Sequence, residues 1–283
     1  MPDFSRLIRF TRLIRLTPRP GLWAAVLLLG GCAPMLVGPP RVLIHGEQHD
    51  QPAHQQQTAE TVSALAARGR LAAVVMEMAD AGHDTRALAA DASEDAARAA
   101  LGWQERAWPW SAYGPVVMNA LRAGVPVLGG NLPRTALRAT MADATLDDAV
   151  PAAVAELLRR AIDEGHCGLL PAALQPGMLR VQIARDRQMA TTVMQALRKA
   201  TPGQSVLLLT GEQHAARDRG VPLHLVAAGL AADRIRVLGW TGGSALPVDE
   251  RREAPRAETV DHCADLVRRP PDGAAKVQPP PLR

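Results

Sequence analysis

Between residues 41 and 243 the chain alternates short apolar runs with longer stretches of helical character. The apolar runs are rich in Val, Leu and Ile and end at Gly or at a polar residue, a pattern that predicts buried β-strands. They cover residues 41–45, 72–76, 125–130, 205–209 and 234–238. The stretches between them predict helices and include residues 52–68, 151–164 and 176–199. Because strands alternate with helices, we expect an α/β fold with a mostly parallel sheet flanked by helices.

Two parts of this domain contain no strand-like run, at about 79–123 and 135–200. We expect them to form a helical subdomain inserted into the α/β domain of residues 41–243. Pro126 implies that the third strand begins there or lies near an edge, because Pro cannot donate to a strand ladder. The segment 222–230 fits either a strand or a short helix.

The N-terminus predicts export. Residues 1–31 combine a basic start with a short apolar segment, as secretory signal peptides do. The Leu-Gly-Gly that precedes Cys32 resembles a bacterial lipobox, in which the cysteine is lipidated and becomes the mature N-terminus. We therefore expect lipidation of Cys32 and an anchor linker over residues 32–40; an ordinary signal peptide with an incidental cysteine is the alternative. The residue after Cys32 is Ala33 and not Asp, which is typical of lipoproteins anchored in the bacterial outer membrane. We therefore expect the protein to be anchored there, facing the periplasm or the cell surface.

The basic charge belongs to the export signal. The whole chain has a formal net charge of +4, and residues 1–31 carry five Arg and one Asp, which is also +4. The remaining chain is therefore near neutral with His uncharged. Because nucleic-acid binding needs a basic face, we expect no nucleic-acid partner.

The C-terminal part, residues 244–283, is polar and rich in Pro, which predicts a partly disordered tail. It contains Cys263, and Cys167 lies in the middle of the chain. In an exported protein this pair predicts a disulfide. Two free thiols are the alternative.

Polar side chains follow several predicted strands. The tetrapeptide Gly-Glu-Gln-His occurs twice, at residues 46–49 and 211–214, each time at a strand end. Ligands of open α/β sheets sit at the carboxyl ends of strands, so we expect these side chains to converge. Imidazole with carboxylate suits a divalent metal or acid–base chemistry, and Arg can hold a carboxylate. The candidate site residues are Glu47, His49, Glu77, His214, Arg134 and Asn131. Arg134 could instead be a solvated loop charge, and Asn131 a turn residue.

Aromatic residues are rare and clustered. Outside residues 1–31 the chain has five, and Trp103, Trp108, Trp110 and Tyr113 fall within eleven residues. Such a cluster suits a flat aromatic ligand or an interface, although a local plug over a small-residue core explains it equally. Tyr113 is the only Tyr, and Tyr is one of the known axial ligands of haem iron.

Taken in order, these motifs resemble those of the ChaN-like haem-binding uptake lipoproteins, a family within a wider erythromycin-esterase-like and Tiki/TraB-like group. The resemblance rests on the two tetrapeptides, Glu77, the Trp110–Pro115 stretch and Asn131-Leu132-Pro133-Arg134, together with Gln182, Asp186 and Met189. It implies a non-enzymatic outer-membrane lipoprotein for iron or haem uptake, with Tyr as iron ligand and dimerisation around paired haems. Tyr113 matches that ligand; Arg134, Asn131, His49 and His214 are further haem-site candidates.

The same strand ends allow two other functions. In a metal-dependent hydrolase, as the Tiki-like and esterase-like relatives suggest, Glu47, His49, Glu77 and His214 would bind a divalent metal ion or act as acids and bases. A structural lipoprotein with a degenerate site would bind neither haem nor metal.

Overall fold

The computed structural model describes residues 39–258, 261, 263 and 264. The expected export signal and Cys32 lie outside these residues, as does the tail after Ala264. Within the described chain no helix is long and apolar enough to cross a membrane.

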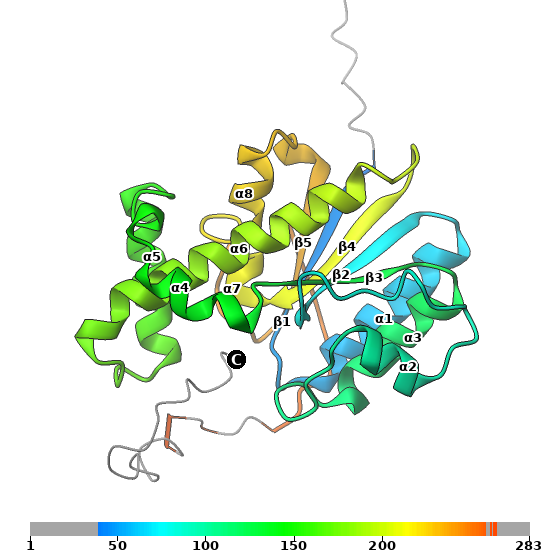
Figure 1. Cartoon of the computed structure of the whole chain (residues 1–283), viewed down its shortest axis with the longest axis horizontal. Coiled ribbons are helices and arrows are strands. Elements are labelled where there is room, and N and C mark those ends of the chain that lie inside the picture. The colour runs from blue at the N-terminus through cyan, green and yellow to red at the C-terminus, as the bar shows by residue number, and fades with distance from the viewer. Residues whose placement is uncertain (1–38, 259–260, 262, 265–283) are drawn as a thin grey trace, which may run out of the picture. The chain divides into compact units, whose positions relative to one another are not determined.

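A six-stranded parallel sheet forms the centre of the described chain and confirms the predicted α/β class (Figure 1). The strand order is β3-β2-β4-β1-β5-β6. Since β1 pairs directly with β4, Glu47 lies opposite Gly211 and the two tetrapeptides meet at one edge of the sheet. The strands are β1 Val42–Glu47, β2 Leu71–Asp80, β3 Val127–Asn131, β4 Ser205–Gly211, β5 Ile235–Trp240 and β6 Glu250–Arg252.

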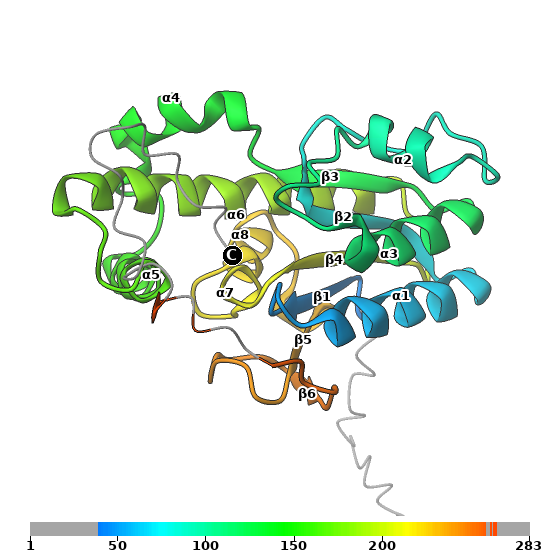
Figure 2. The same cartoon turned by 90° about the horizontal axis from the view of Figure 1, so that it is seen from below.

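Helices cover both faces of the sheet. On one face α1 (Pro52–Ala67) and α3 (Trp110–Arg122) lie side by side (Figures 1 and 2), with α2 (Glu94–Ala100) next to α3. Their core joins Val62 and Val116 to Val74 of the sheet. On the other face α6 (Gln175–Leu197) and α8 (Val221–Ala227) pack through Val193 and Leu225.

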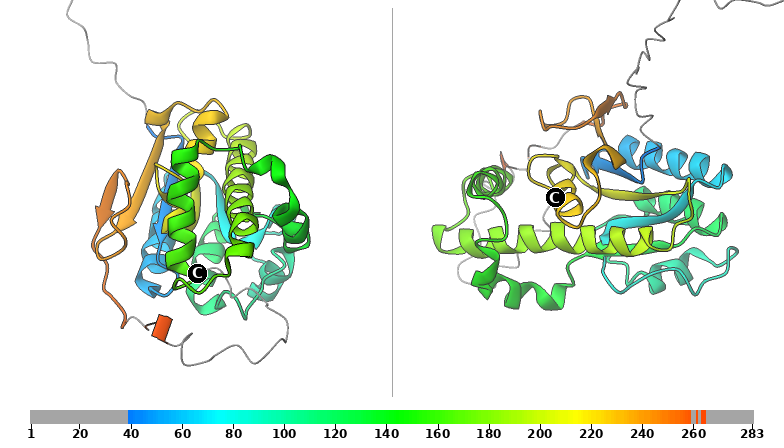
Figure 3. Two further views of the ribbon diagram at one scale, coloured as in Figure 1. Left: turned by 90° about the vertical axis from the view of Figure 1, so that its left-hand side faces the viewer. Right: turned by 90° about the horizontal axis from the view of Figure 1, so that it is seen from above.

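A separate helical cluster extends from the sheet along α6 (Figures 2 and 3). It contains α4 (Leu137–Ala142), α5 (Ala152–Gly165) and the first half of α6, which share a core of their own. The helical subdomain is therefore smaller than we predicted. Residues 79–123 do not belong to it, because the apolar face of α3 packs on α1 and the sheet. The last turns of α6 do not belong to it either, because they cover the opposite face of the sheet. Short elements complete the chain: α7 Glu212–Ala215 and 3-10 turns at Arg134–Ala136, Ala144–Leu146, Ala172–Leu174 and Ala232–Arg234.

Four further expectations can be compared with the structure. The third strand begins directly after Pro126 and lies at an edge, as its sequence predicted. Segment 222–230 is mostly the helix α8. The tail from residue 244 onward, which we expected to be partly disordered, has an ordered strand near its start, because β6 pairs with β5. Farther along the tail Cys263 forms a disulfide with Cys167, their Cα atoms 5.6 Å apart.

Candidate functional site

Alternation along the strands divides the strand-end residues into two groups. Leu43, His45 and Glu47 of β1 point to the face covered by α1 and α3, where His45 bonds Thr58 of α1. Val75 of β2 belongs to the opposite core, on the α6 side. Glu77 lies two residues later in the same strand and therefore points to the same face. Glu47 and Glu77 therefore belong to separate clusters of polar side chains, on opposite faces of the sheet at the carboxyl ends of its strands.

The first cluster surrounds the carboxylate of Glu47, which is 1% exposed. Its Oε1 lies 2.8 Å from Nδ1 of His49 and accepts a 2.6 Å hydrogen bond from the hydroxyl of Tyr113. Its Oε2 accepts a 2.7 Å hydrogen bond from Gln55 of α1. Because both carboxylate oxygens are occupied by donors, Glu47 fixes the orientation of the His49 ring.

The second cluster surrounds Glu77. Its Oε2 accepts hydrogen bonds from the hydroxyl of Thr210 at 2.6 Å and from the backbone N–H of Gly211 at 2.8 Å. Its Oε1 lies 3.5 Å from Nε2 of His214. The other ring nitrogen of His214, Nδ1, lies 2.6 Å from Oδ1 of Asp186. His214 is thus held between two buried carboxylates.

Two glycines allow these clusters to meet. A Cβ on Gly211 would lie 2.8 Å from Nε2 of His49 and 3.6 Å from Oε2 of Glu77. The lack of a side chain at Gly211 therefore leaves space for the ring of His49. A Cβ on Gly46 would lie 2.5 Å from the Cβ of Ala215 in α7. The glycine of each tetrapeptide is therefore required for the close approach of β1, β4 and α7.

Burial and their mutual contact shift the pKa values of both Glu47 and His49. Burial raises the pKa of the Glu47 carboxyl, although the hydrogen bonds it accepts oppose this. Burial also disfavours a charged His49, but the hydrogen bond to Glu47 and the charge of Glu77 outweigh it and raise the pKa of His49. Burial and the neighbouring Glu47 raise the pKa of Tyr113, so its phenol stays protonated.

The second cluster contains a strong anion. Burial opposes ionisation of Glu77, yet the charges of His214 and His49 and the Thr210 and Gly211 hydrogen bonds lower its pKa to about 2. Burial raises the pKa of Asp186 to about 6. For His214, burial is again outweighed by the charges of Glu77 and Asp186, which raise its pKa.

An aromatic wall closes the Glu47 side. The ring of Trp108 lies edge-on against His49 at 4.9 Å and against Tyr113 at 5.9 Å. Trp103 contacts the rings of both Trp110 and Tyr113. Trp103 and Trp108 are only partly buried, whereas Tyr113 is 1% exposed. The outer two rings are the ones available to a ligand.

The structure brings Glu47, His49, Tyr113, Glu77 and His214 together, as the sequence predicted. The hydroxyl of Tyr113 is buried and donates to Glu47, so it does not face solvent as an open iron ligand. Glu77 and His214 are 2% and 6% exposed and are engaged with protein partners.

Other predicted rim residues lie at the periphery. The side chain of Asn131 forms hydrogen bonds with backbone groups: it donates to the carbonyl of Glu77 and accepts from the N–H of Leu132. Arg134 is exposed, and its backbone N–H donates to Asp80. The glutamate of the second tetrapeptide, Glu212, binds Ser244 and has no part in either cluster.

Sequence reasoning assigned no chemistry to Gln55, Thr210 or Asp186, which complete the two clusters. Asp186 and Gln182 lie one helical turn apart on α6, and Gln182 also contacts His214, at 3.1 Å. Their shared helix face was the signal that could have placed them. Gln55 had no comparable signal, because its role depends on how α1 packs beside β1.

His49 has one ring nitrogen that could bind a ligand. No group of three or more His, Cys, Asp or Glu in the described residues is arranged to hold a metal ion. Nε2 of His49 makes no hydrogen bond within the described chain, while Nδ1 is anchored by Glu47. The His49 side chain is 10% exposed and lies beside Trp108. One free imidazole nitrogen with a carboxylate behind it fits the axial position of haem iron.

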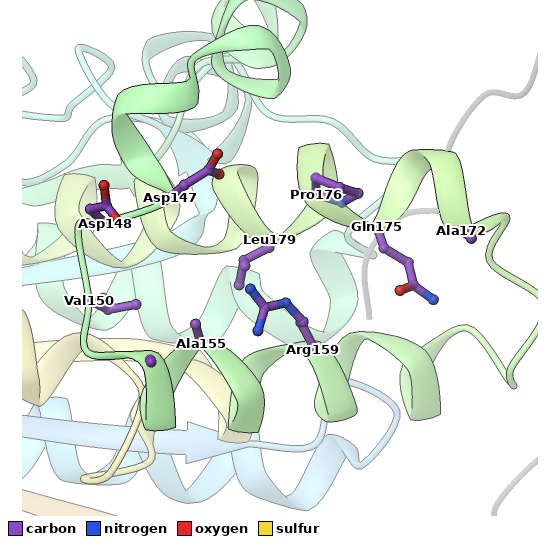
Figure 4. Close-up of a pocket in the computed structure, with 10 residues that line it drawn as sticks. Asp147, Asp148, Val150, Ala155, Arg159, Ala172, Gln175, Pro176 and Leu179 are labelled. Atoms are coloured by element: carbon purple, nitrogen blue, oxygen red, sulfur yellow. The ribbon is translucent and has the colours of Figure 1, made fainter.

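A cavity of about 520 Å³ lies elsewhere, between α5 and α6 (Figure 4). Its lining is mixed: Val150, Ala155 and Leu179 are apolar, and the polar side chains are Asp147, Asp148, Arg159 and Gln175. None of its lining residues is a His, Tyr or Cys, and none belongs to the strand-end site. It therefore offers no ligand for haem iron.

Comparison with known proteins agrees with the architecture. The sequence model of the family described as "Haem-binding uptake, Tiki superfamily, ChaN" matches residues 38–225. A solved structure of cofacial heme binding to ChaN of Campylobacter jejuni is 22% identical, covers 72% of this chain and 83% of that chain, and has a TM-score of 0.58. A mutant erythromycin esterase in its open conformation is 16% identical over 72% of this chain and 71% of that chain, with a TM-score of 0.43. Among curated proteins, none matches the sequence.

Proposed function

Because this chain belongs to the ChaN family of haem-binding uptake proteins in the Tiki superfamily, we propose that it binds haem at the strand-end site and serves haem or iron uptake. Family membership supports haem as the ligand. The single structural observation that supports this site is the free Nε2 of His49, on a ring that lies beside the partly exposed Trp108.

In this proposal His49 is the iron ligand and Glu47 sets its properties. A carboxylate on the far nitrogen fixes the imidazole orientation and increases its basicity as a ligand. Haem would supply the iron centre and a flat aromatic surface, which Trp103 and Trp108 suit. The chain supplies orientation, a partly dry environment and a carboxylate 2.8 Å from Nδ1 of His49.

Tyr113 has a supporting role in this arrangement. To bind iron as a phenolate it would have to lose its proton, and burial and the neighbouring Glu47 raise its pKa. It would also have to break its hydrogen bond to Glu47. We therefore assign Tyr113 to holding Glu47, and through Glu47 the His49 ring.

The location of this activity is also part of the proposal. The lipobox-like sequence before Cys32 and Ala33 after it support a lipid-anchored protein of the outer membrane. Palmitate labelling of the full chain, compared with Cys32→Ser, tests the anchor. Sedimentation with and without hemin tests whether ligand binding brings two copies together.

The haem proposal is tested by titrating purified protein with hemin and following the Soret band. We expect a saturable Soret shift for the wild type, loss of this shift for His49→Ala, and retention for His83→Ala, which removes an exposed histidine on the loop after β2. An unchanged hemin spectrum with wild-type protein would contradict the proposal. Equal loss in both variants would contradict the assignment to His49.

A second candidate function is acid–base hydrolysis without a bound metal. It is favoured by two imidazoles that each have a carboxylate on Nδ1, His49 with Glu47 and His214 with Asp186. Such a pair can take a proton from water and return it to a leaving group. Hydrolysis of a chromogenic ester that is abolished in both His49→Ala and His214→Ala would support it. Wild-type protein without measurable hydrolysis across a panel of esters would contradict it.

A further inference from the structure

Arg185 of α6 is a partly buried guanidinium without a protein partner. Its Nε is buried and makes no hydrogen bond, and its terminal nitrogens make no hydrogen bond or ion pair within the described part of the chain. By contrast, Arg180 binds Asp147 through two 2.7 Å hydrogen bonds, and Arg217 binds Asp249. Leaving a buried donor without a partner costs free energy, so Arg185 has a donor to offer to a ligand.

The position of Arg185 places it beside the second cluster. Gln182 and Asp186 both contact His214, at 3.1 and 2.6 Å, and Arg185 lies three residues after the first and one before the second on the same helix. Residues three and four positions apart share one face of a helix, so Arg185 lies on the side of α6 that contacts His214. This side of α6 lies next to the proposed ligand site.

The nearby carboxylates do not satisfy Arg185. Oε2 of Glu77 is occupied by Thr210 and Gly211, and its Oε1 faces His214. Oδ1 of Asp186 faces His214, and its Oδ2 is buried without a partner. Asp80 accepts from the backbone of Arg134. A carboxylate brought by a ligand can instead bind the terminal nitrogens in the two-pronged geometry that guanidinium groups favour.

We infer that Arg185 is a carboxylate-binding subsite of the strand-end site and holds one carboxylate group of the ligand. Several carboxylates already surround it, so it suits a singly charged carboxylate better than a phosphate dianion. The identity of the ligand rests on the proposed function: if the ligand is haem, the group is a propionate. This assigns to Arg185 the role that the sequence suggested for Arg134, whose exposed guanidinium would gain little from such a pair.

The first test compares hemin with its dimethyl ester, in which both propionates are neutral. We expect the wild type to prefer hemin by roughly tenfold or more in Kd, the range for a hydrogen bond to a charged group. Arg185→Gln should lose this preference and Arg185→Lys should keep part of it. Arg187→Gln, an exposed arginine on the same helix, is the matched control and should behave as wild type. A preference for hemin that persists in a folded Arg185→Gln protein would overturn the inference.

The second test does not depend on haem. Sodium propionate is titrated into the full chain while the side-chain resonances of His214 are followed by NMR, with inorganic phosphate as the comparison anion. We expect a saturable shift with propionate in wild type and Arg187→Gln, no saturable shift in Arg185→Gln, and weaker binding of phosphate. No saturable shift in the wild type would overturn the subsite even if hemin binds. If hemin fails to bind while propionate shows this Arg185-dependent shift, the haem proposal fails and the subsite stands.

Discussion

Nδ1 of His49 lies 2.8 Å from Oε1 of Glu47, two residues earlier in the same strand-end tetrapeptide. This contact decides which nitrogen of the ring is free, because it fixes Nδ1 toward a buried carboxylate and leaves Nε2 to point past Gly211. The second tetrapeptide repeats the sequence but not the contact, since Glu212 binds Ser244 and His214 turns to Asp186. Two identical sequences therefore carry out two different tasks.

Replacing Glu47 by Gln should weaken hemin binding by roughly 10- to 100-fold, the usual cost of removing the partner of a metal-bound histidine. The amide is neutral, so it no longer raises the basicity of His49. Glu212→Gln is the matched control, because it changes the glutamate of the other copy of the motif. Hemin titration of both variants measures the effect, and equal affinities would contradict the role of Glu47.

Replacing Tyr113 by Phe should leave a hemin complex with a histidine-type spectrum. The variant loses one donor to Glu47, and the free energy of unfolding should fall by roughly 1–3 kcal/mol. Urea unfolding gives the stability and the absorption spectrum of the complex gives the ligand type. Complete loss of hemin binding by a folded Tyr113→Phe protein would show that the phenol itself is required.

Gly211→Ala should disturb the site more than the fold. The added Cβ would lie 2.8 Å from Nε2 of His49, so the ring must move away. We expect hemin affinity to fall by roughly tenfold or more, with a loss of stability of about 1–3 kcal/mol, as is usual for overpacking. Gly165→Ala at the end of α5, where a Cβ meets nothing within 4 Å, is the control. Unchanged hemin affinity in Gly211→Ala would contradict the position assigned to His49.

Glu77 should make stability depend on acid pH. Its pKa is lowered from 4.5 to about 2 in the folded chain, so its contribution is present above about 4.5 and is lost as the pH falls toward about 2. Linkage gives this contribution a magnitude of about 3 kcal/mol. We expect Glu77→Gln to be less stable than wild type at pH 6 and the difference to shrink at pH 3. Urea unfolding at these two pH values measures it, and a difference that grows in acid would contradict the assignment.

The pattern of apolar runs was sufficient to predict the parallel sheet and the meeting of the two tetrapeptides, because strand ends of one direction share an edge. The pattern could not place α3: its apolar positions fit a subdomain helix as well as a sheet-covering one, and only packing against Val62 of α1 decides. β6 was missed because its three residues, Glu250–Arg252, are all charged and the sheet edge alone orders them.

The sequence predicted most of the residues that form the site, but not the contacts that they make with one another. Tyr113 was recognised from its rarity, but the sequence does not say that its helix turns the hydroxyl inward to Glu47. Asp186 and Arg185 lie far along the chain from the strands they face, so their roles depend on how α6 crosses the sheet. Long-range packing of helices on strand ends was the missing information.

The identity of the protein ligand to iron tests the central claim most directly. Resonance Raman and electron paramagnetic resonance spectra of the wild-type hemin complex distinguish an imidazole nitrogen from a phenolate oxygen. We predict a nitrogen ligand, with signals that shift when the protein is labelled with ¹⁵N-histidine and that disappear in His49→Ala. Phenolate bands that disappear in Tyr113→Phe would contradict the account.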